Sequence, residues 1–233
     1  MALALYTPKN PEDPDYRESW SKLNYQRSII EPLVNICKGD SFKNDINPKI
    51  LPCITQIIHH SGSQMDTYGW SCAIEVITLL IDEVQNNEDI FYLLKNIIND
   101  YFSYLTPFNL NSLLSLIGTF SLYESNNNIC FSAIELFWSC ANMISSYTTE
   151  YQNNNEEVIK LLTINFGDIS LDDLFKEFWK LLFYKLLSIN KDKRKDVKTC
   201  GLNVFAEIFE AKEKFMSEDI KRLIINDITL KIL

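Results

Sequence analysis

Apolar residues recur along this chain at the spacing of one helix face. Four stretches place them at positions i, i+3, i+4 and i+7, the pattern of a helix with one buried stripe. These stretches cover residues 70–84, 129–144, 171–186 and 197–208. None of them shows the strict alternation that a half-buried strand requires. The spacing therefore predicts an all-α protein.

Helix start signals fall where these stripes begin. Asn47–Pro48 and Thr106–Pro107 each place a capping residue before a proline at the first helical position. Ser170 is followed by two aspartates, which favours a capped entry at the positive end of a helix. We expect neighbouring helices to be antiparallel, because mostly short connections join them. The expected helices are 18–38, 48–62, 67–85, 88–104, 107–124, 128–147, 171–189, 194–211 and 217–230.

Composition excludes several other classes of protein. Six glycines and seven prolines are too few for the frequent turns of a β-sandwich or barrel. A net charge of −9 disfavours a nucleic-acid binder, which needs a basic face. The apolar start at residues 1–6 lacks a basic region and runs into prolines, so we do not expect a signal peptide. No uninterrupted apolar stretch reaches the length that spans a bilayer.

Two polar stretches interrupt the helical pattern. Residues 38–47 read as a hinge after the first helix, and a second break covers residues 145–161. The second break contains the sequence YQNNNEE, which has little to bury and is typical of a surface loop. The expected domain organisation begins with an extended N-terminal segment at residues 1–16. The remaining residues, 17–233, are expected to form a single helical-repeat domain with a polar insert near 148–160.

Helix pairs of about 40 residues have the period of HEAT and armadillo repeats. Residues 192–209 match the second-helix pattern D-x-R-x-x-V-R-x-x-A-x-x-x-L of a HEAT repeat, with Lys198 in place of the second arginine and Gly201 in place of the alanine. The pattern predicts that Asp192 accepts amides at the helix start, that Arg194 reaches a carboxylate in the neighbouring repeat and that Val197 packs inward. A small residue, Gly201, would let two helices approach closely. The expected architecture is an α-solenoid of HEAT/armadillo-like antiparallel helix pairs.

No motif for catalysis, a metal or a cofactor is visible. His59 and His60 are adjacent, so they point about 100° apart on a helix, and no cysteine or carboxylate stands at ligand spacing. Neither a nucleophile elbow nor a glycine-rich phosphate loop occurs. The six cysteines are widely spaced and are expected to be buried, reduced thiols. We therefore expect a protein without enzymatic activity, metal, cofactor or small-molecule substrate.

The remaining notable side chains are tryptophans and a short basic run. Trp70, Trp138 and Trp179 are expected to pack in the core. Residues 191–198 are basic on an otherwise acidic chain. One interpretation is a solvated turn between two helices. The other is a patch that contacts anionic lipid or an acidic partner through Lys193, Arg194, Lys195 and Lys198.

Four islands of sequence carry a resemblance to a known family. Residues 24–33 (NYQRSIIEPL) resemble the F-Q-x-x-(hydrophobic)-L-x-P-F segment that follows the catalytic domain in large Arf guanine-nucleotide exchange factors of the Sec-seven type. Residues 68–70 (YGW) resemble the S-G-W helix start of the same region. Residues 128–138 (NICFSAIELFW) are similar to N-I-S-L-T-x-I-x-L-L-W in the Mon-two proteins, which lack the catalytic domain. Residues 178–198 resemble their L-W … D-x-R-x-x-V-R segment.

The resemblance implies a scaffold in vesicle traffic that is peripheral to Golgi and endosomal membranes. It implies partners of the Dopey type and small GTPases of the Arf and Arf-like families, and no catalytic residues. Because family members are far longer than 233 residues, the chain resembles a middle-to-late segment of such a protein.

Two other functions stay open at this stage. The chain resembles the catalytic exchange factors at residues 199–202 (TCGL), so it could be the regulatory helical region of such an enzyme. A transport-receptor-type solenoid that carries cargo peptides is the other alternative.

Overall fold

The computed structural model describes residues 14–39, 43–81, 87–167 and 169–232, and every regular element in this part of the chain is helical. Ten α-helices and several short 3-10 turns follow one another without a strand among the described residues. The all-α prediction is therefore confirmed. The chain divides into two compact units, residues 1–112 and 113–233, which are described separately.

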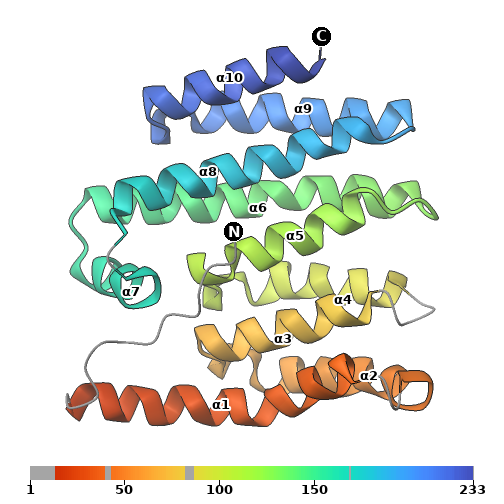
Figure 1. Cartoon of the computed structure of the whole chain (residues 1–233), viewed down its shortest axis with the longest axis vertical. Coiled ribbons are helices and arrows are strands. Elements are labelled where there is room, and N and C mark those ends of the chain that lie inside the picture. The colour runs from red at the N-terminus through yellow and green to blue at the C-terminus, as the bar shows by residue number, and fades with distance from the viewer. Residues whose placement is uncertain (1–13, 40–42, 82–86, 168, 233) are drawn as a thin grey trace. The chain divides into compact units, whose positions relative to one another are not determined.

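The first unit is built around helix α3 (Figure 1). Its helices are α1 (Pro14–Lys38), α2 (Lys43–Ser61), α3 (Thr67–Leu80) and α4 (Asn87–Asp100), followed by the start of α5 (Leu110–Ser121). Helix α3 packs against both α1 and α2. Trp70, Ile74, Ile77 and Leu80 on one face of this helix are completely buried. Burial of this stripe removes apolar surface from water and so stabilises the unit.

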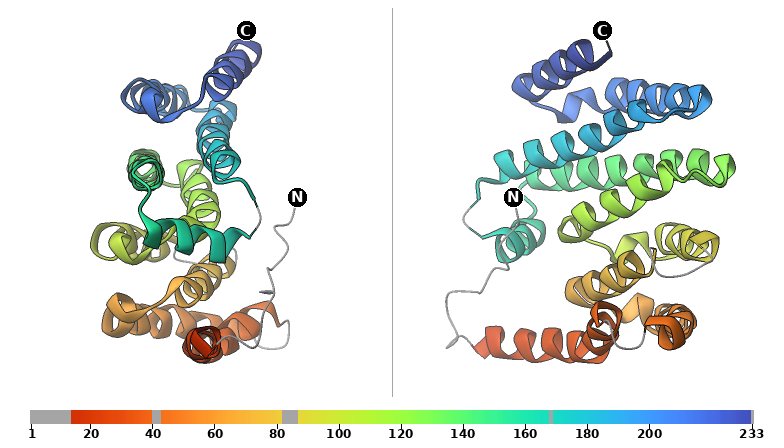
Figure 2. Two further views of the ribbon diagram at one scale, coloured as in Figure 1. Left: turned by 90° about the vertical axis from the view of Figure 1, so that its left-hand side faces the viewer. Right: turned by 45° about the vertical axis from the view of Figure 1, so that its right-hand side comes forward.

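The second unit has two layers of helices (Figure 2). Its helices after α5 are α6 (Asn127–Gln152), α7 (Glu156–Phe166), α8 (Leu171–Ser188), α9 (Lys195–Lys212) and α10 (Glu218–Ile232). Helix α6 packs against α9 within one layer and against α8 of the other layer. Helix α8 also packs against α10. The aromatic side chains of Trp179, Phe183 and Phe205 meet between α8 and α9, with the rings of Phe183 and Phe205 4.9 Å apart.

Helix α6 is long and apolar enough to cross a membrane by length and composition. Within the unit, however, 61% of its apolar window is buried against other helices. Ile134, Phe137 and Cys140 on this helix have no exposed surface. The apolar character of α6 is thus accounted for by its place in the core.

Several helix ends differ from the expected ones. Helix α2 begins at Lys43, so Asn47–Pro48 is not a helix start, and Pro48 lies inside the helix. The expected hinge at 38–47 is therefore shorter, and residues 40–42 lie outside the described part. Ser170 does precede α8, but its side chain makes no capping hydrogen bond. The Thr106–Pro107 start is confirmed: the Thr106 amide donates to Asn109 Oδ1 at 3.2 Å, and the first turn is a 3-10 helix.

The expected polar insert at residues 148–160 is mostly helical, so the prediction of a loop there is wrong. Helix α6 continues to Gln152, and α7 begins at Glu156. Thr148 is buried, and its hydroxyl donates to the Ile144 carbonyl at 2.7 Å. Only three asparagines connect the helices, and the last of them, Asn155, caps α7 by accepting the Glu157 amide at 3.1 Å.

The N-terminal expectation is tested over only three residues. Residues 1–13 of the expected extended segment lie outside the described part. The next three residues, Pro14–Tyr16, belong to the first turn of α1 and are not extended. A proline is well suited to that position because it has no amide hydrogen to lose.

Candidate interaction surfaces

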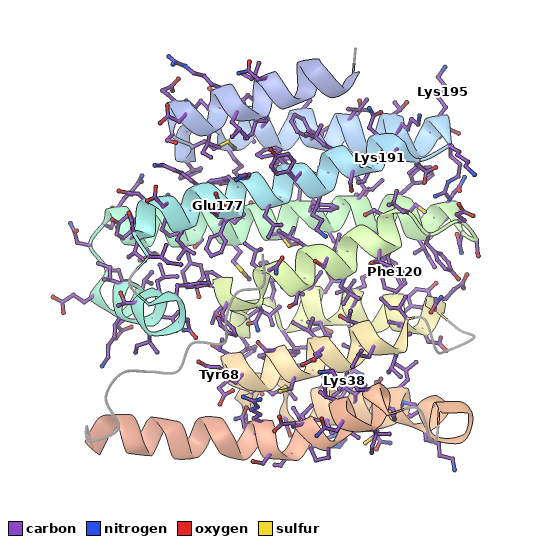
Figure 3. All side chains as sticks on the ribbon, viewed as in Figure 1. Lys38, Tyr68, Phe120, Glu177, Lys191 and Lys195 are labelled. Carbon is purple, nitrogen blue, oxygen red and sulfur yellow. The ribbon has the colours of Figure 1, made fainter. Side chains whose placement is uncertain are left out.

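Two of the family-like sequence islands meet at one point of the first unit. Gln26 on α1 accepts the Asp66 amide at 2.8 Å through Oε1 and donates from Nε2 to the Gln64 carbonyl at 2.9 Å. Asp66 in turn caps α3, because its carboxylate accepts the amides of Tyr68 and Gly69 at 3.0 and 2.7 Å. We call these hydrogen bonds the Gln26 clasp. It joins the α1 island to the start of the α3 island, and Figure 3 shows Tyr68 at this start.

Gly69 completes the clasp by leaving room for it. A Cβ atom at this position would lie 2.5 Å from Gln26 Oε1, which is far inside van der Waals contact. The next residue, Trp70, has no exposed surface, and its ring lies 5.7 Å from that of Tyr101. Gln26 and Gly69 therefore fix α1 against the start of α3. Trp70 packs in the core beside Tyr101, so the roles of these three family-like residues are architectural.

The clasp predicts that Gly69→Ala destabilises the chain when Gln26 is present and stabilises it when Gln26 is replaced by alanine. In the wild-type chain the added methyl group displaces the Gln26 amide, and we expect a loss of about 1 kcal/mol from the broken hydrogen bonds. In a Gln26→Ala background the space is open, so the same change should stabilise α3 by up to about 1 kcal/mol through its helix propensity. Urea unfolding of the four proteins measures this coupling. Equal effects of Gly69→Ala in both backgrounds would contradict the clasp.

Asp192 and Arg194 form the second notable cluster. Arg194 donates from Nη2 to Asp192 Oδ2 at 2.7 Å and from Nε to Oδ1 at 3.0 Å, and its own amide also reaches Oδ1 at 2.7 Å. Nη1 extends to the α5–α6 connection, where it donates to the Tyr123 carbonyl and to Asn127 Oδ1, both at 2.9 Å. The hydrogen bonds from Arg194 hold the pKa of Asp192 below its ordinary value. The Asp192 side chain is 7% exposed, so this carboxylate is largely removed from water, whereas the Arg194 side chain is partly exposed.

This cluster corrects the expectation for Arg194. The guanidinium does cross to the preceding helical hairpin, but it meets a carbonyl and an amide oxygen there, and its carboxylate partner is Asp192 of its own loop. Asp192 accepts the amide hydrogen of Arg194, the residue that precedes α9, which agrees with its predicted role at the start of this helix. Val197 is completely buried, as predicted. A Cβ atom on Gly201 would lie 2.9 Å from Ile189 Cγ2, so the small residue does permit a close approach.

The basic run at the start of α9 divides into structural and free charges. Lys193 and Lys195 are exposed and Lys198 is half-buried. Figure 3 shows Lys195 pointing away from the ribbon, with Lys191 at the end of the preceding turn. Arg194 differs from these lysines because its guanidinium is used for internal hydrogen bonds. Of the four residues in the predicted patch, Lys193, Lys195 and Lys198 are thus at least partly open to solvent, whereas Arg194 holds the loop beneath them.

A groove of about 790 Å³ lies between α6 and α9. One wall is a stripe of α6 at spacing i, i+4 and i+7, and the other is a stripe of α9 that runs over three turns. Nine residues line it: Phe131, Glu135, Trp138, Asp196, Thr199, Cys200, Asn203, Val204 and Glu207. The groove is open to solvent and carries two aromatic rings and three carboxylates, without a lysine or arginine in its lining.

The groove shows that the prediction for one tryptophan is wrong. Trp70 and Trp179 are buried as expected, but Trp138 is partly exposed in the α6–α9 groove. The residue before it, Phe137, occupies the buried stripe. Adjacent helical residues point about 100° apart, so Trp138 faces the groove. That rotation is the sequence signal that places Trp138 outside the buried stripe of α6.

The histidine pair and the cysteines are the remaining candidate sites. His59 and His60 are exposed on the last turn of α2, and His60 Nδ1 lies 2.9 Å from the Gln56 carbonyl oxygen. In the described part of the chain no three histidines, cysteines or carboxylates gather as metal ligands would. Cys37, Cys130 and Cys140 are buried thiols, whereas Cys53 is exposed and Cys72 and Cys200 are intermediate. The expected burial of the cysteines thus holds for only part of the set.

Comparison with known proteins relates the first part of the chain to a family. The family model described as Mon2/Sec7/BIG1-like, HDS matches residues 16–98, the stretch that contains the Gln26 clasp and Trp70. The chain is also 22% identical over 148 residues to Protein MON2 homolog from Caenorhabditis briggsae. That match covers 61% of this chain and 9% of the relative, so the chain spans only a small part of that relative's length. No solved structure matches. The comparisons confirm the resemblance expected from the sequence, and the family that this chain resembles is the trafficking-related Mon2/Sec7 type.

Proposed function

We propose that this chain is a non-catalytic scaffold segment of a vesicle-trafficking protein on Golgi and endosomal membranes. The observation that carries the proposal is that the family-like residues build the helical frame. Gln26, Gly69 and Trp70 lie within the family match; the first two fix α1 against α3, and Trp70 is buried in the core of the unit. A segment whose characteristic residues build its frame is suited to presenting its outer surfaces to other proteins. Its partners would be a Dopey-type protein and GTPases of the Arf and Arf-like families.

We also propose that the helices form an α-solenoid of HEAT/armadillo-like pairs. Within each unit, helices pack against the next helix but one: α1 on α3 in the first unit, and α6 on α8 and α8 on α10 in the second. The residues of the HEAT-like pattern, Asp192, Val197 and Gly201, support the same arrangement. A solenoid binds over an extended surface, which is consistent with an open groove and an exposed basic patch.

Direct binding tests the proposed function. The purified chain would be titrated with an Arf-like GTPase loaded with a non-hydrolysable GTP analogue or with GDP, and separately with a Dopey-type protein. We expect saturable binding to the Dopey-type protein or to the GTP form of the GTPase. Absence of binding to all of them, with the helical circular-dichroism signal intact, would contradict the proposal.

The basic patch predicts a charge-dependent association with membranes. Reversing Lys193, Lys195 and Lys198 to glutamate should lower flotation of the chain with phosphatidylserine vesicles by at least fivefold, since each charge near an anionic surface contributes about 1 kcal/mol. Arg194 stays unchanged in this variant because it holds the loop. A variant with Lys49, Lys95 and Lys160 reversed has the same net charge and should float as the wild type does. An equal loss of flotation in both variants would show that the basic patch is not a specific membrane-binding surface.

A second candidate is the regulatory helical region of a catalytic Arf exchange factor. It is favoured by the family model, whose description names Sec7 and BIG1 beside Mon2. An exchange domain encoded on the same parent protein would decide for this candidate, and its absence from the full parent sequence would decide for the scaffold.

A further inference from the structure

The groove between α6 and α9 has the chemistry of a binding site for a positively charged chain. Glu135, Asp196 and Glu207 are exposed, and each is without an ion-pair partner among the described residues. Elsewhere in the unit, exposed carboxylates such as Asp173 and Glu177 are paired with lysines three residues away. Unpaired carboxylates around a hollow create a negative potential that attracts and orients a cation.

The carboxylates converge on the groove from both helices. Glu135 projects from α6, whereas Asp196 and Glu207 stand at the two ends of the α9 stripe. Burial raises the pKa of the Cys200 thiol in the groove, and Glu135 and Glu207 raise it further. Carboxylates from both walls of the groove thus act on the same thiol. The α9 carboxylates are eleven residues apart, or about 16 Å along the helix axis. An extended chain covers that distance in about five residues.

Two aromatic rings line the same groove. Phe131 and Trp138 are partly exposed, and neither stacks on another aromatic ring of the described residues. An exposed tryptophan face attracts lysine and arginine side chains, and the combination with nearby carboxylates holds both the charge and the aliphatic stem. The groove therefore offers a stacking surface in its α6 wall and charge partners on both sides.

We propose that the α6–α9 groove binds an extended, lysine- or arginine-rich segment of a partner protein. One basic side chain of the segment lies over Trp138, and others pair with Glu135, Asp196 and Glu207. Charge complementarity decides the occupant: an acidic peptide or an anionic lipid surface would be repelled by the three carboxylates. This binding site goes beyond the proposed scaffold function, and it could exist whether or not the chain binds Arf-like GTPases.

Fluorescence anisotropy with a labelled hexa-arginine peptide tests the proposal on the full chain. The wild type should bind the peptide saturably and should not bind hexa-glutamate. The double variant Glu135→Lys/Glu207→Lys should weaken binding at least tenfold, and Trp138→Leu about threefold or more. The matched variant Glu124→Lys/Glu210→Lys changes the net charge equally at exposed sites outside the groove, so its affinity should stay within twofold of the wild type.

Hydrogen exchange on the wild type locates the peptide without any substitution. Protection by hexa-arginine should be strongest in residues 131–138 and 196–207. Protection spread evenly over the acidic surface would overturn the proposal. So would equal weakening in the two double variants, an unchanged affinity of Trp138→Leu, or failure of the wild type to bind hexa-arginine.

Discussion

Replacing Trp70 with alanine should lower the free energy of unfolding of the first unit by about 4 kcal/mol, in the range found for buried tryptophans. Trp70 is the largest completely buried side chain of α3, and its ring packs beside Tyr101. Its Nε1 has no hydrogen-bond partner, so the loss comes from packing and from the cavity that remains. Urea unfolding followed by circular dichroism at 222 nm measures the change.

Two further variants isolate the cause of the Trp70 effect. Trp70→Phe keeps an aromatic ring and should lose less than half as much stability as the alanine variant. Tyr92→Ala removes an aromatic side chain that is 54% exposed on α4, and it should cost less than about 0.5 kcal/mol. A loss below about 1 kcal/mol for Trp70→Ala would show that α3 does not organise the unit's core.

The second large effect is expected at Arg194. Replacing it with alanine removes both side-chain hydrogen bonds to Asp192 and the contacts to Tyr123 and Asn127. The largely buried Asp192 carboxylate then lacks its partner, and we expect a loss of about 2 kcal/mol, below the value for a fully buried pair because the arginine remains partly exposed. Lys193→Ala, one residue away and exposed, should change stability by less than about 0.5 kcal/mol.

The same pair gives a pH dependence with a definite sign. Because Arg194 lowers the pKa of Asp192 in the folded chain, the pair stabilises the fold above the ordinary aspartate pKa of about 3.9. That contribution disappears as the pH falls through the lowered folded-state value. The stability of the wild type should therefore drop more between pH 5 and pH 2 than that of Asp192→Asn. Parallel pH profiles for the two proteins would contradict the assignment.

The sequence predicted the helices and most of the buried side chains because apolar spacing reports directly on which face is buried. It placed Trp70, Trp179 and Val197 correctly for that reason. Arg194 shows where this reasoning stops. Its partner at Tyr123 is 71 residues away along the chain, and no local pattern specifies which oxygen of the preceding hairpin the guanidinium reaches.

Residues 148–160 and Trp138 were misjudged for related reasons. Consecutive asparagines are typical of loops, but one asparagine can cap a helix and another can adopt the positive φ of 55° seen at Asn154, so a three-residue turn is enough. Trp138 was assigned to the core from its residue type, although its position next to Phe137 turns it toward the α6–α9 groove. The groove itself depends on two helices that are some sixty residues apart, and only their packing creates it.

The distribution of the fluorescently tagged chain in living cells tests the proposed scaffold function most directly. The measurement is its overlap with Golgi and endosomal markers, compared with a tagged Trp70→Ala chain in which the first unit is destabilised. The account predicts that the wild type concentrates on these membranes and that the variant is largely displaced from them. A wild-type chain that is folded yet spread evenly through the cytosol would contradict it.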